Sequence, residues 1–495
     1  MQNSAPVFLA EHIRAIEQGA MSRREPPALM ERAGLAVAEL AGGLAGDRTR
    51  RILALAGPGN NGGDALIAAR HLKSWWFDVR VVFTGDASQL GADARAAHDA
   101  WRDAGGTLAG EMPPDFRWDL ALDGLFGIGL ARDLDARHAR LVAALNESGK
   151  QVVAIDVPSG LDADTGRVHG AAVRAAHTLT FLGLKAGLFT ADGPDHAGEV
   201  HLDRLGLEDE PLPDGHGWLI GDEIIAGALP RRSRNAHKGM FGDVGVVGGA
   251  PGMVGAALLA GRAALKLGAG RVFVGLLGKG PEVDLFQPDL MLRPAEEILS
   301  RERLGCLVLG PGLGQSDAAR HALEKALSHD APLVLDADAL NLLAAGRALR
   351  AALARRRQPA LLTPHPAEAA RLLGTTTAQV QRDRVRNALA LARDTRAFAV
   401  LKGAGSVCVT PEGRWHLNTS GNPGMAVAGM GDVLAGMLGA LLAQGAAPEA
   451  ALLAGVHAHG LAGDELVARG IGPVGLTASE TIDTARQVWN RLAAR

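Results

Sequence analysis

The chain has 495 residues, of which 47% are hydrophobic and 21% are charged, and its 65 glycines follow no collagen-like period. These values are typical of a soluble globular enzyme, and the length predicts more than one domain. The net charge of −3 gives no reason to expect binding to nucleic acid or to an anionic membrane.

Two cysteines are present, Cys306 and Cys408, and both lie in apolar runs typical of strands. They exclude a disulfide framework and favour a reducing, cytoplasmic compartment. The first residues lack the basic and apolar regions of a signal peptide, so none is expected. The most apolar stretch, 425–457, is interrupted by polar residues, so no membrane span is expected either.

The first half of the sequence alternates helix-like with strand-like runs. Residues 5–45 are expected to form two helices, the second at Pro27–Leu44, where apolar residues recur every three or four positions. Strands are then predicted at Arg51–Ala56, Val79–Phe83, Leu120–Asp123, Gln151–Asp156 and Thr178–Phe181. Helices are predicted between them at Asp64–Trp75, Gly91–Asp103 and Ala136–Ser148. This alternation predicts a parallel, doubly wound α/β sheet.

Polar segments follow three of these strands directly. The segment Gly57–Asp64 (GPGNNGGD) is read as a loop after the first strand, Asp123 ends the third, and Ile155–Gly166 (IDVPSGLDADTG) leaves the fourth. The carboxyl ends of parallel strands share one edge of the sheet, where ligands bind at a topological switch point. We therefore expect these segments to meet.

The residue types at this edge suit two kinds of ligand. Oxygen atoms of Asn61, Asp123 and Ser159 are suitable for a hard cation, whereas Asp156 and the loop Gly127–Asp133 (GIGLARD) would face an organic ligand. Taken singly, the Asn-Gly pair is also an ordinary turn, and Asp-Val-Pro is an ordinary strand exit.

Four segments together closely resemble the YjeF N-terminal family, the NAD(P)H-hydrate epimerases: GPGNNGGD, DGLFGIG (Asp123–Gly129), IDVPSGLDADTG and FLGLKAGL (Phe181–Leu188). The resemblance covers roughly residues 10–205 and implies an epimerase domain, 1–205, that is a Rossmann-like three-layer αβα sandwich. It implies a potassium ion bound by Asn61, Asp123 and Ser159. Asp156 is the predicted proton shuttle, and Lys185 is a weaker candidate that is equally explained as a surface lysine. The implied contacts to the hydrated nicotinamide nucleotide are Asn60, Asn61, Gly62, Gly63, Asp64, Gly127, Ile128, Gly129, Leu130, Ala131, Arg132, Asp133 and Asp156.

The segment 206–217 (GLEDEPLPDGHG) is acidic, contains Pro and Gly and lacks an apolar period, so it is the predicted linker to a second domain, 218–495. Strands of this domain are predicted at Asp243–Val247, Arg271–Leu276, Cys306–Leu309, Pro332–Asp336, Ala360–Thr363 and Phe398–Lys402. Helices are predicted at Val254–Leu267, Val433–Ala443 and 450–468. This half is therefore a second α/β unit.

The most informative stretch of the second half is Ala428–Gly436 (AGMGDVLAG). Its glycines allow a ligand to approach the backbone, and the N–H groups at a helix start are suited to phosphate. Asp432 beside such a phosphate would accept a proton from an attacking hydroxyl or help to hold a metal. The alternative is an ordinary N-cap aspartate. The segment Lys402–Ser406 (KGAGS), at the end of an apolar strand, is a second candidate phosphate loop.

The motifs VVGG, GPGLG (Gly310–Gly314), DADALN (Asp336–Asn341), TPHP, KGAGS and NPGMAVAGMGDVLAG resemble the YjeF C-terminal family, the ADP- or ATP-dependent NAD(P)H-hydrate dehydratases of the ribokinase-like superfamily. The resemblance covers about residues 222–490 and implies a ribokinase-like α/β fold, ADP or ATP with Mg²⁺, and Asp432 as the catalytic base. The implied substrate contacts are Ala257, Gly312, Gly314, His365 and Asp432; the implied nucleotide contacts are Lys402, Gly403, Ala404, Gly405, Ser406 and Gly431. The chain departs from the family pattern at Met253, where a Tyr is common, and at Ala367, where a Gly is common.

Together these observations predict a bifunctional repair enzyme that epimerises the hydrates NADHX and NADPHX and dehydrates their S forms, and a homo-oligomer is expected. One alternative is a ribokinase-like small-molecule kinase with a non-catalytic amino-terminal nucleotide-binding module. It would release a stable phosphorylated product. A second alternative makes the first domain a nucleotide-sensing module that binds the hydrates without exchanging their epimers.

Overall fold

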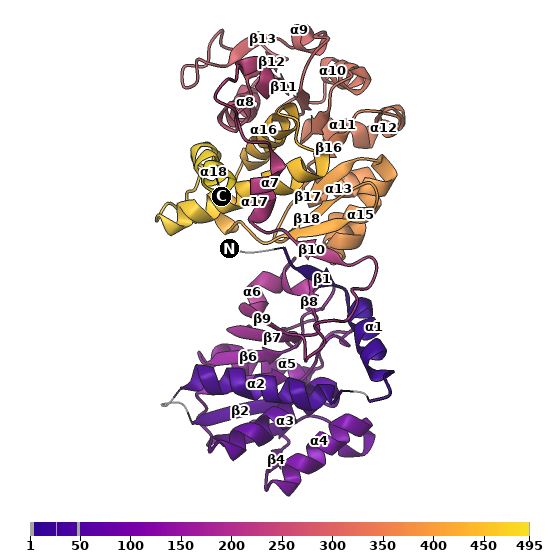
Figure 1. The fold of residues 1–495 in the computed structure, drawn as a ribbon, viewed down its shortest axis with the longest axis vertical. Helices are drawn as coiled ribbons and strands as arrows, with labels where there is room; N and C mark the ends of the chain where they lie inside the picture. The colour runs from indigo at the N-terminus through magenta and orange to yellow at the C-terminus, as the bar shows by residue number, and fades with distance from the viewer. Residues whose placement is uncertain (1–3, 26, 47–49, 495) are drawn as a thin grey trace. The chain divides into compact units, whose positions relative to one another are not determined.

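The computed structural model describes residues 4–25, 27–46 and 50–494. The chain divides into two compact units. The amino-terminal unit is Pro6–His216, and the carboxy-terminal unit contains residues 4–5 and 217–494. In Figure 1 the first unit runs from indigo to magenta and the second from magenta to yellow. Within the described residues, no helix combines the length and the apolar character that a membrane span needs.

The amino-terminal unit is built on a seven-stranded sheet whose neighbouring strands are all parallel. The order across the sheet is β4 (Leu108–Ala109), β3 (Asp78–Phe83), β2 (Arg51–Ala56), β5 (Leu120–Gly124), β6 (Gln151–Ile155), β7 (His177–Phe181) and β9 (Glu199–Asp203). The predicted parallel sheet is confirmed. A short parallel pair, β1 (Pro6–Phe8) with β8 (Leu184–Lys185), lies outside these seven strands.

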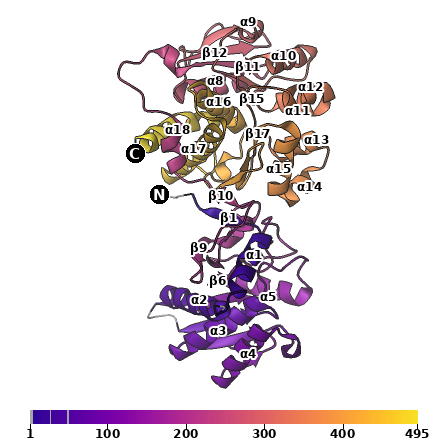
Figure 2. The same ribbon diagram turned by 45° about the vertical axis from the view of Figure 1, so that its right-hand side comes forward.

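Helices cover both faces of this sheet (Figure 2). Because side chains alternate along a strand, Ile52 and Ala54 belong to one core and Leu53 and Leu55 to another. The first core receives α1 (Ala10–Met21), α2 (Leu29–Ala45), α3 (Asn60–Ser74) and α4 (Ala92–Asp103), and the second receives α5 (Ala136–Glu147). The short α6 (Gly193–Ala197) precedes β9. The result is the expected three-layer αβα sandwich.

The predicted loop at Gly57–Asp64 is wrong in its second half, because α3 begins at Asn60. The two glycines of this second half, Gly62 and Gly63, lie in α3 and are tightly packed. A Cβ on Gly62 would lie 1.9 Å from the carbonyl oxygen of Gly57, and one on Gly63 would lie 2.6 Å from Sδ of Met30. These glycines therefore allow the first turn of α3 to pack closely against the end of β2 and against α2.

The sheet of the carboxy-terminal unit contains both parallel and antiparallel strands. Its order is β13 (Met291–Pro294), β12 (Arg271–Leu276), β11 (Asp243–Gly248), β14 (Cys306–Leu309), β15 (Leu333–Leu335), β16 (Ala360–Leu362), β17 (Phe398–Leu401), β18 (Ser406–Val409), β19 (Trp415–Asn418) and β10 (Gly217–Leu219). The strands from β13 to β17 are parallel, whereas β18 is antiparallel to both of its neighbours. The sequence did not predict the β18–β19 hairpin, whose strands are only four residues long.

This sheet also lies between two helical layers (Figure 1). One face packs against α7 (Glu223–Ala228), α8 (Val254–Lys266), α16 (Met430–Ala443), α17 (Pro448–Ala468) and α18 (Ala478–Ala493). The other layer contains α9 (Ala295–Leu299), α10 (Asp317–Ser328), α11 (Asp338–Ala345), α12 (Arg347–Ala354), α13 (Pro366–Leu373), α14 (Thr377–Arg382) and α15 (Arg384–Thr395). Both units are therefore α/β layers around a largely parallel sheet, as the sequence predicts.

Candidate active sites

The topological switch point of the amino-terminal sheet lies between β2 and β5, because the chain continues from β2 to one side and from β5 to the other. The two strand exits touch there. The N–H of Gly57 donates to the carbonyl oxygen of Gly124 over 3.0 Å, and a Cβ on Gly57 would lie 1.8 Å from the carbonyl oxygen of Leu125. Glycine at position 57 is what permits this contact.

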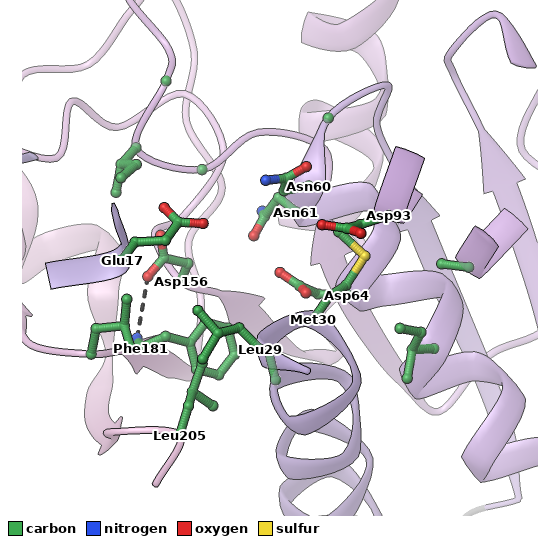
Figure 3. A pocket seen from close by; sticks show the side chains of 18 of the residues that line it. Glu17, Leu29, Met30, Asn60, Asn61, Asp64, Asp93, Asp156, Phe181 and Leu205 are labelled. Carbon is green, nitrogen blue, oxygen red and sulfur yellow. Dashed lines mark hydrogen bonds between the residues drawn. The ribbon is translucent and has the colours of Figure 1, made fainter. Parts of the chain in front are cut away.

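A pocket of about 1210 Å³ opens at this switch point (Figure 3). Many of the predicted substrate contacts line it: Asn60, Asn61, Asp64, Gly127, Ile128, Gly129, Leu130, Ala131, Arg132 and Asp156. Gly62, Gly63 and Asp133 are not among its lining residues. The sequence did not single out Glu17 of α1 or Leu29 and Met30 of α2, which also line the pocket.

Asp156 lies at the exit of β6, next to a lysine that has no contact with solvent. Its backbone has a φ of 67°, a left-handed conformation that Asp tolerates better than most residues. Its Oδ1 accepts hydrogen bonds from Lys185 Nζ and, over 3.2 Å, from the N–H of Phe181. Lys185 is fully buried and also donates to the carbonyl oxygen of Phe181 over 2.6 Å. The alternative that Lys185 is a surface residue is therefore wrong.

Four further carboxyl residues line this pocket with Asp156, namely Glu17, Glu31, Asp64 and Asp93, and the pKa values of two of them are shifted. Burial, followed by the negative charge of Asp156, raises the pKa of Glu17. Burial also raises the pKa of Asp64 well above its ordinary value, and the charges of Asp156 and Glu17 act in the same direction. For Lys185, burial lowers the pKa, and Asp156 opposes that effect. Figure 3 shows Glu17 beside Asp156, with Asp64 and the two asparagines across the pocket.

The three predicted cation ligands come from adjacent elements. Asp123 is completely buried, and its Oδ2 accepts the N–H of Ser159 over 2.8 Å. Among the described residues it forms no ion pair with a basic side chain, and burial raises its pKa to about 6. The Nδ2 atom of Asn61 is buried without a hydrogen-bond partner. A buried carboxylate without a counter-charge suits a monovalent cation, whereas the unpartnered N–H groups of Asn61 are donors that suit an acceptor on a bound ligand.

The carboxy-terminal sheet has its own switch point, between β11 and β14. The loops after these strands are joined by hydrogen bonds: the N–H of Ala250 donates to the carbonyl oxygen of Gly312 over 2.7 Å. Gly312 has a φ of 57° and lies against the backbone of Met253, while the N–H of Gly314 donates to Asp338 Oδ2 over 2.8 Å. Ala257 is fully buried beneath these loops.

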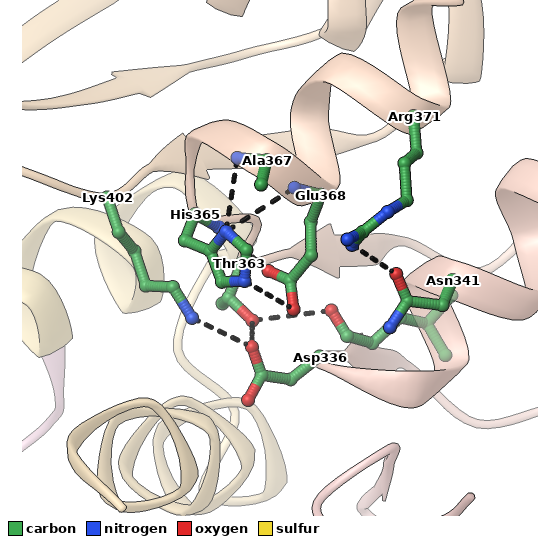
Figure 4. A network of polar contacts seen from close by, with 9 residues as sticks. Asp336, Asn341, Thr363, His365, Ala367, Glu368, Arg371 and Lys402 are labelled. Atoms are coloured by element: carbon green, nitrogen blue, oxygen red, sulfur yellow. Dashed lines mark hydrogen bonds and ion pairs between the residues drawn. The ribbon is translucent and has the colours of Figure 1, made fainter. Parts of the chain in front are cut away.

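A buried aspartate, Asp336, is the centre of a polar network at this edge (Figure 4). Its Oδ1 accepts hydrogen bonds from the hydroxyl of Thr363 over 2.6 Å and from Lys402 Nζ over 3.0 Å. Burial lowers the pKa of Lys402, but Asp336 and Glu368 more than offset this effect, so the pKa is raised. Asp336 belongs to the DADALN motif but was not predicted as a site residue.

Asp432 meets this network from the first turn of α16. The helix begins at Met430 rather than at the predicted Val433, and its N-cap is Gly429, with a φ of 92°. The alternative that Asp432 is an N-cap is therefore wrong. Burial raises the pKa of Asp432 to about 7; the charge of Asp336 also raises it, and that of Lys402 lowers it.

Gly431, in the first turn of α16, lies close to the side chains of Lys402 and Asp336. A Cβ on Gly431 would lie 3.0 Å from Lys402 Nζ and 3.4 Å from Asp336 Oδ2. Asp432, Lys402 and Gly431, all predicted from sequence, are thus brought together around Asp336.

His365 caps α13, and Glu368 completes the same turn. The His365 Nδ1 accepts the N–H of Ala367 over 3.1 Å, and the N–H of His365 donates to Glu368 Oε2 over 2.8 Å. Burial lowers the pKa of His365 and raises that of Glu368 to about 7. The side chain of His365 remains half exposed, so it is available to a ligand. The sequence did not single out Glu368 as a site residue.

The turn Lys402–Ser406 between β17 and β18 is held by a buried arginine that the sequence did not single out. Arg384 donates to the carbonyl oxygens of Leu401, Lys402 and Gly405 over 3.1, 3.3 and 3.4 Å. Gly403 has a φ of 142°, and a Cβ there would lie 2.9 Å from the guanidinium. The hydrogen bonds from Arg384 therefore hold the backbone of the predicted nucleotide-binding turn, which also contains Ala404, in one conformation.

Comparison with known proteins places both units. The model of a family described as "YjeF-related protein N-terminus" matches residues 27–187, and that of the "NAD(P)H-hydrate dehydratase" family matches residues 244–485. A bifunctional NAD(P)H-hydrate repair enzyme from Coxiella burnetii is 38% identical over 89% of this chain and 90% of its own length. The enzyme of that name from Escherichia coli is 38% identical over 93% and 89%. The chain belongs to the family of bifunctional NAD(P)H-hydrate repair enzymes.

Members of this family occur in eukaryotes as well as bacteria. A relative from Leishmania major, also named a bifunctional NAD(P)H-hydrate repair enzyme, is 38% identical over 93% of this chain and 89% of its own length. Among solved structures, an ADP/ATP-dependent NAD(P)H-hydrate dehydratase from Bacillus subtilis, co-crystallised with ATP and Mg²⁺, is 31% identical. It covers 55% of this chain and 98% of its own, with a TM-score of 0.49. The three relatives, which match 89% to 93% of this chain, extend the family assignment over both units.

Proposed function

We propose that this chain repairs hydrated nicotinamide nucleotides, NADHX and NADPHX, with its two units acting in sequence. The amino-terminal unit interconverts the R and S hydrates, and the carboxy-terminal unit uses ADP or ATP to dehydrate the S form to NAD(P)H. The observation that carries this proposal is the cluster of Asp432, Lys402 and Asp336 at the carboxyl edge of the sheet, in a chain that matches bifunctional repair enzymes over most of its length. A site that positions one hydroxyl for phosphoryl transfer rejects the other epimer, so an epimerase in the same chain recycles it.

In the dehydratase, Asp432 accepts the proton of the substrate hydroxyl as that oxygen attacks the terminal phosphoryl group of the nucleotide. A pKa of about 7 suits this role because the carboxylate is ionised in part of the molecules and still basic enough to accept a proton. The phosphorylated oxygen then leaves as orthophosphate, expelled by the lone pair of the ring nitrogen. Loss of a proton from the neighbouring carbon restores the dihydropyridine ring.

The nucleotide would lie on the turn Lys402–Ser406 and the start of α16, where N–H groups and the ammonium of Lys402 meet phosphate charge. The carboxylates of Asp336 and Asp338, whose charges both raise the pKa of Asp432, are hard oxygen ligands of the kind that hold Mg²⁺. The ion would offset the negative charge of the phosphates.

In the epimerase, the bond between C6 and its hydroxyl breaks with help from the ring nitrogen, and water returns on the other face. Glu17, whose pKa is raised by burial and by the charge of Asp156, gives a proton to the leaving hydroxyl. Asp156, which forms an ion pair with Lys185, accepts the proton of the incoming water. Potassium, held by Asp123, Ser159 and Asn61, would supply the positive charge that the buried carboxylate lacks.

A coupled assay tests the whole proposal. A mixture of NADHX epimers is incubated with the full chain, Mg²⁺ and either ADP or ATP, and the return of dihydronicotinamide absorbance and the release of orthophosphate are followed. We expect both products in equal amounts and complete consumption of both epimers. A stable phosphorylated product would instead favour the small-molecule kinase, and conversion of only one epimer would favour a non-catalytic amino-terminal unit.

A further inference from the structure

A cluster of metal-binding side chains lies in the amino-terminal unit at the edge of the sheet opposite the pocket. It consists of His177, the first residue of β7, together with Glu199 and His201 on β9. His177 pairs with Glu199 in the strand register, and His201 follows two residues later, so all three side chains are on one face. In the part of the chain that the structure describes, no other three such side chains bring their ligand atoms this close together.

The distances in this cluster fit a tetrahedral metal ion. His177 Nδ1 lies 3.1 Å from His201 Nε2, and the two carboxylate oxygens of Glu199 lie 3.7 and 3.9 Å from these nitrogens. Two ligand atoms about 2.05 Å from a tetrahedral zinc ion are about 3.4 Å apart. The nitrogen–nitrogen distance is somewhat shorter than this value and the nitrogen–oxygen distances, which involve different oxygens of Glu199, are somewhat longer; one ligand atom from each residue lies within 4.8 Å of the other two, so a small side-chain adjustment would place all three around one ion.

A hydrogen bond between the two rings would by itself explain only their contact with each other. It does not explain why each oxygen of Glu199, a residue whose side chain is 68% exposed, approaches a different ring nitrogen. Two imidazoles and one carboxylate form a donor set that Zn²⁺ prefers and that Mg²⁺ does not, and water can take the fourth position.

We propose that His177, Glu199 and His201 form a transition-metal site, occupied by Zn²⁺, that fastens the edge strand β9 to β7. This site is separate from the proposed potassium site, because the two lie at opposite ends of parallel strands. β7 has five residues, so His177 at its start and Phe181 at its end are separated by four residue steps, about 13 Å at 3.3 Å per step.

Fastening β9 also supports the pocket wall. At the far end of the strand, the carbonyl oxygen of Asp203 accepts the N–H of Leu182 over 2.9 Å, and Leu182 and Leu205 line the pocket. The backbone ladder already pairs β9 with β7 along the whole of β9, but among the described residues β9 is an edge strand with no partner on its other side, so a metal bridge adds a side-chain link to the only neighbour that it has in this sheet. The site is therefore structural, and it places no ligand on the reacting atoms.

Calorimetric titration of the EDTA-treated full chain with zinc chloride tests the proposal. We expect one Zn²⁺ per chain at this site, and an affinity about tenfold or more weaker in His201→Gln and in Glu199→Gln. The matched control is His71→Gln. His71 Nε2 lies 2.9 Å from Glu31 Oε1, but an arginine, Arg70, is the third member of that group, so zinc binding should be unchanged.

Melting temperature gives an independent measurement. Zinc should raise that of the wild type and of His71→Gln but not that of His201→Gln, while all three proteins should melt alike in EDTA. Zinc affinities that are equal in the wild type and both site variants would overturn the proposal, as would a wild type that binds no zinc. Because none of these readouts depends on NADHX, the proposal can fail while the repair function stands.

Discussion

Each unit places a lysine–aspartate ion pair at the carboxyl edge of its sheet, but the two pairs differ in which aspartate they involve. In the amino-terminal unit the lysine binds Asp156, the proposed proton shuttle itself. In the carboxy-terminal unit Lys402 binds Asp336 and leaves Asp432, the proposed base, with a pKa near 7. The first site therefore binds its proposed base within the ion pair itself, whereas the second places the ion pair beside its proposed base, whose pKa is about 7.

The comparison extends to the remaining acids of the two sites. Among the further carboxyl groups of the amino-terminal pocket, Glu17 has a raised pKa and is the proposed acid, so the proposed site contains an acid and a base together. Glu368, the matching group in the other unit, with a pKa of about 7, is bonded to the backbone of His365 and supports a helix start. Exchange of a hydroxyl needs both a proton donor and a proton acceptor, whereas phosphoryl transfer needs only a proton acceptor from the protein. This requirement agrees with a proton-donating role for Glu17 and a structural role for Glu368.

The largest expected effect is that of Asp432→Asn on dehydration. Loss of a general base should lower turnover roughly 10²–10⁴-fold, while calorimetric affinity for ADP should survive, because the backbone of α16 is unchanged. Melting temperature serves as the control, since the side chain makes no capping bond. Dehydration within threefold of wild type would show that the base is another residue.

Asp156→Asn should reduce epimer exchange by about 10²-fold or more, while the dehydratase rate on the S form stays normal and reports correct folding of the other unit. The variant also leaves Lys185 buried without a counter-charge, so we expect a lower melting temperature. Asp156→Asn with Lys185→Met should recover that melting temperature but not the exchange. Recovery of exchange in the double variant would contradict a catalytic role for Asp156.

Glu17→Gln tests the second half of the acid–base pair. An amide cannot give a proton to the leaving hydroxyl, so exchange should fall by about 10²-fold, again with a normal dehydratase rate on the S form. Arg14→Gln, which alters a neighbouring lining residue on the same helix, is the matched control and should change the exchange rate far less. Similar losses in both variants would mean that Glu17 serves only to bind substrate.

The pH dependence should distinguish the two sites. Because Asp432 must be ionised to act as a base, kcat/KM for dehydration should rise with pH and level off above about 7, with a tenfold change per pH unit on the acid side. The folded state also holds this proton more tightly than the unfolded state. The contribution of Asp432 to stability therefore falls as pH rises from about 4 through about 7. A pH profile that is identical in Asp432→Asn, apart from its size, would refute the assignment.

The smallest expected effect concerns potassium. Potassium chloride, compared with sodium chloride at equal ionic strength, should raise the melting temperature of the amino-terminal transition in the wild type by a few degrees. Asp123→Ala should remove this difference. Since protons compete for Asp123, whose pKa is about 6, the potassium effect should also weaken as pH falls below 6. An unchanged response in the variant would place the ion elsewhere.

The sequence predicted both sheets and the edge at which the sites lie, because apolar runs mark buried parallel strands and polar segments after them must converge. It placed the starts of α3 and α16 too late, because glycines that normally disfavour helix are required there by close packing. The loop reading of Asn60–Gly63 failed for that reason.

Residues that act through distant partners were harder to predict. Lys185 pairs with an aspartate 29 positions away and Lys402 with one 66 positions away, and no local pattern reports such pairs. Arg384 begins α15, a helix that was not predicted from the sequence, and only the fold shows the arginine beneath the turn after β17. Glu17 likewise lies on a helix that precedes the first recognisable motif of the chain.

The position of Arg384 has a consequence for the thermodynamics of nucleotide binding. A turn whose carbonyl oxygens are already bonded to one rigid guanidinium has little conformational freedom to lose when phosphate arrives. The ordering entropy of this loop is therefore lost when the protein folds and not when the nucleotide binds. Arg384→Lys keeps the charge but removes the planar fork, so its ADP affinity should fall mainly through a less favourable binding entropy.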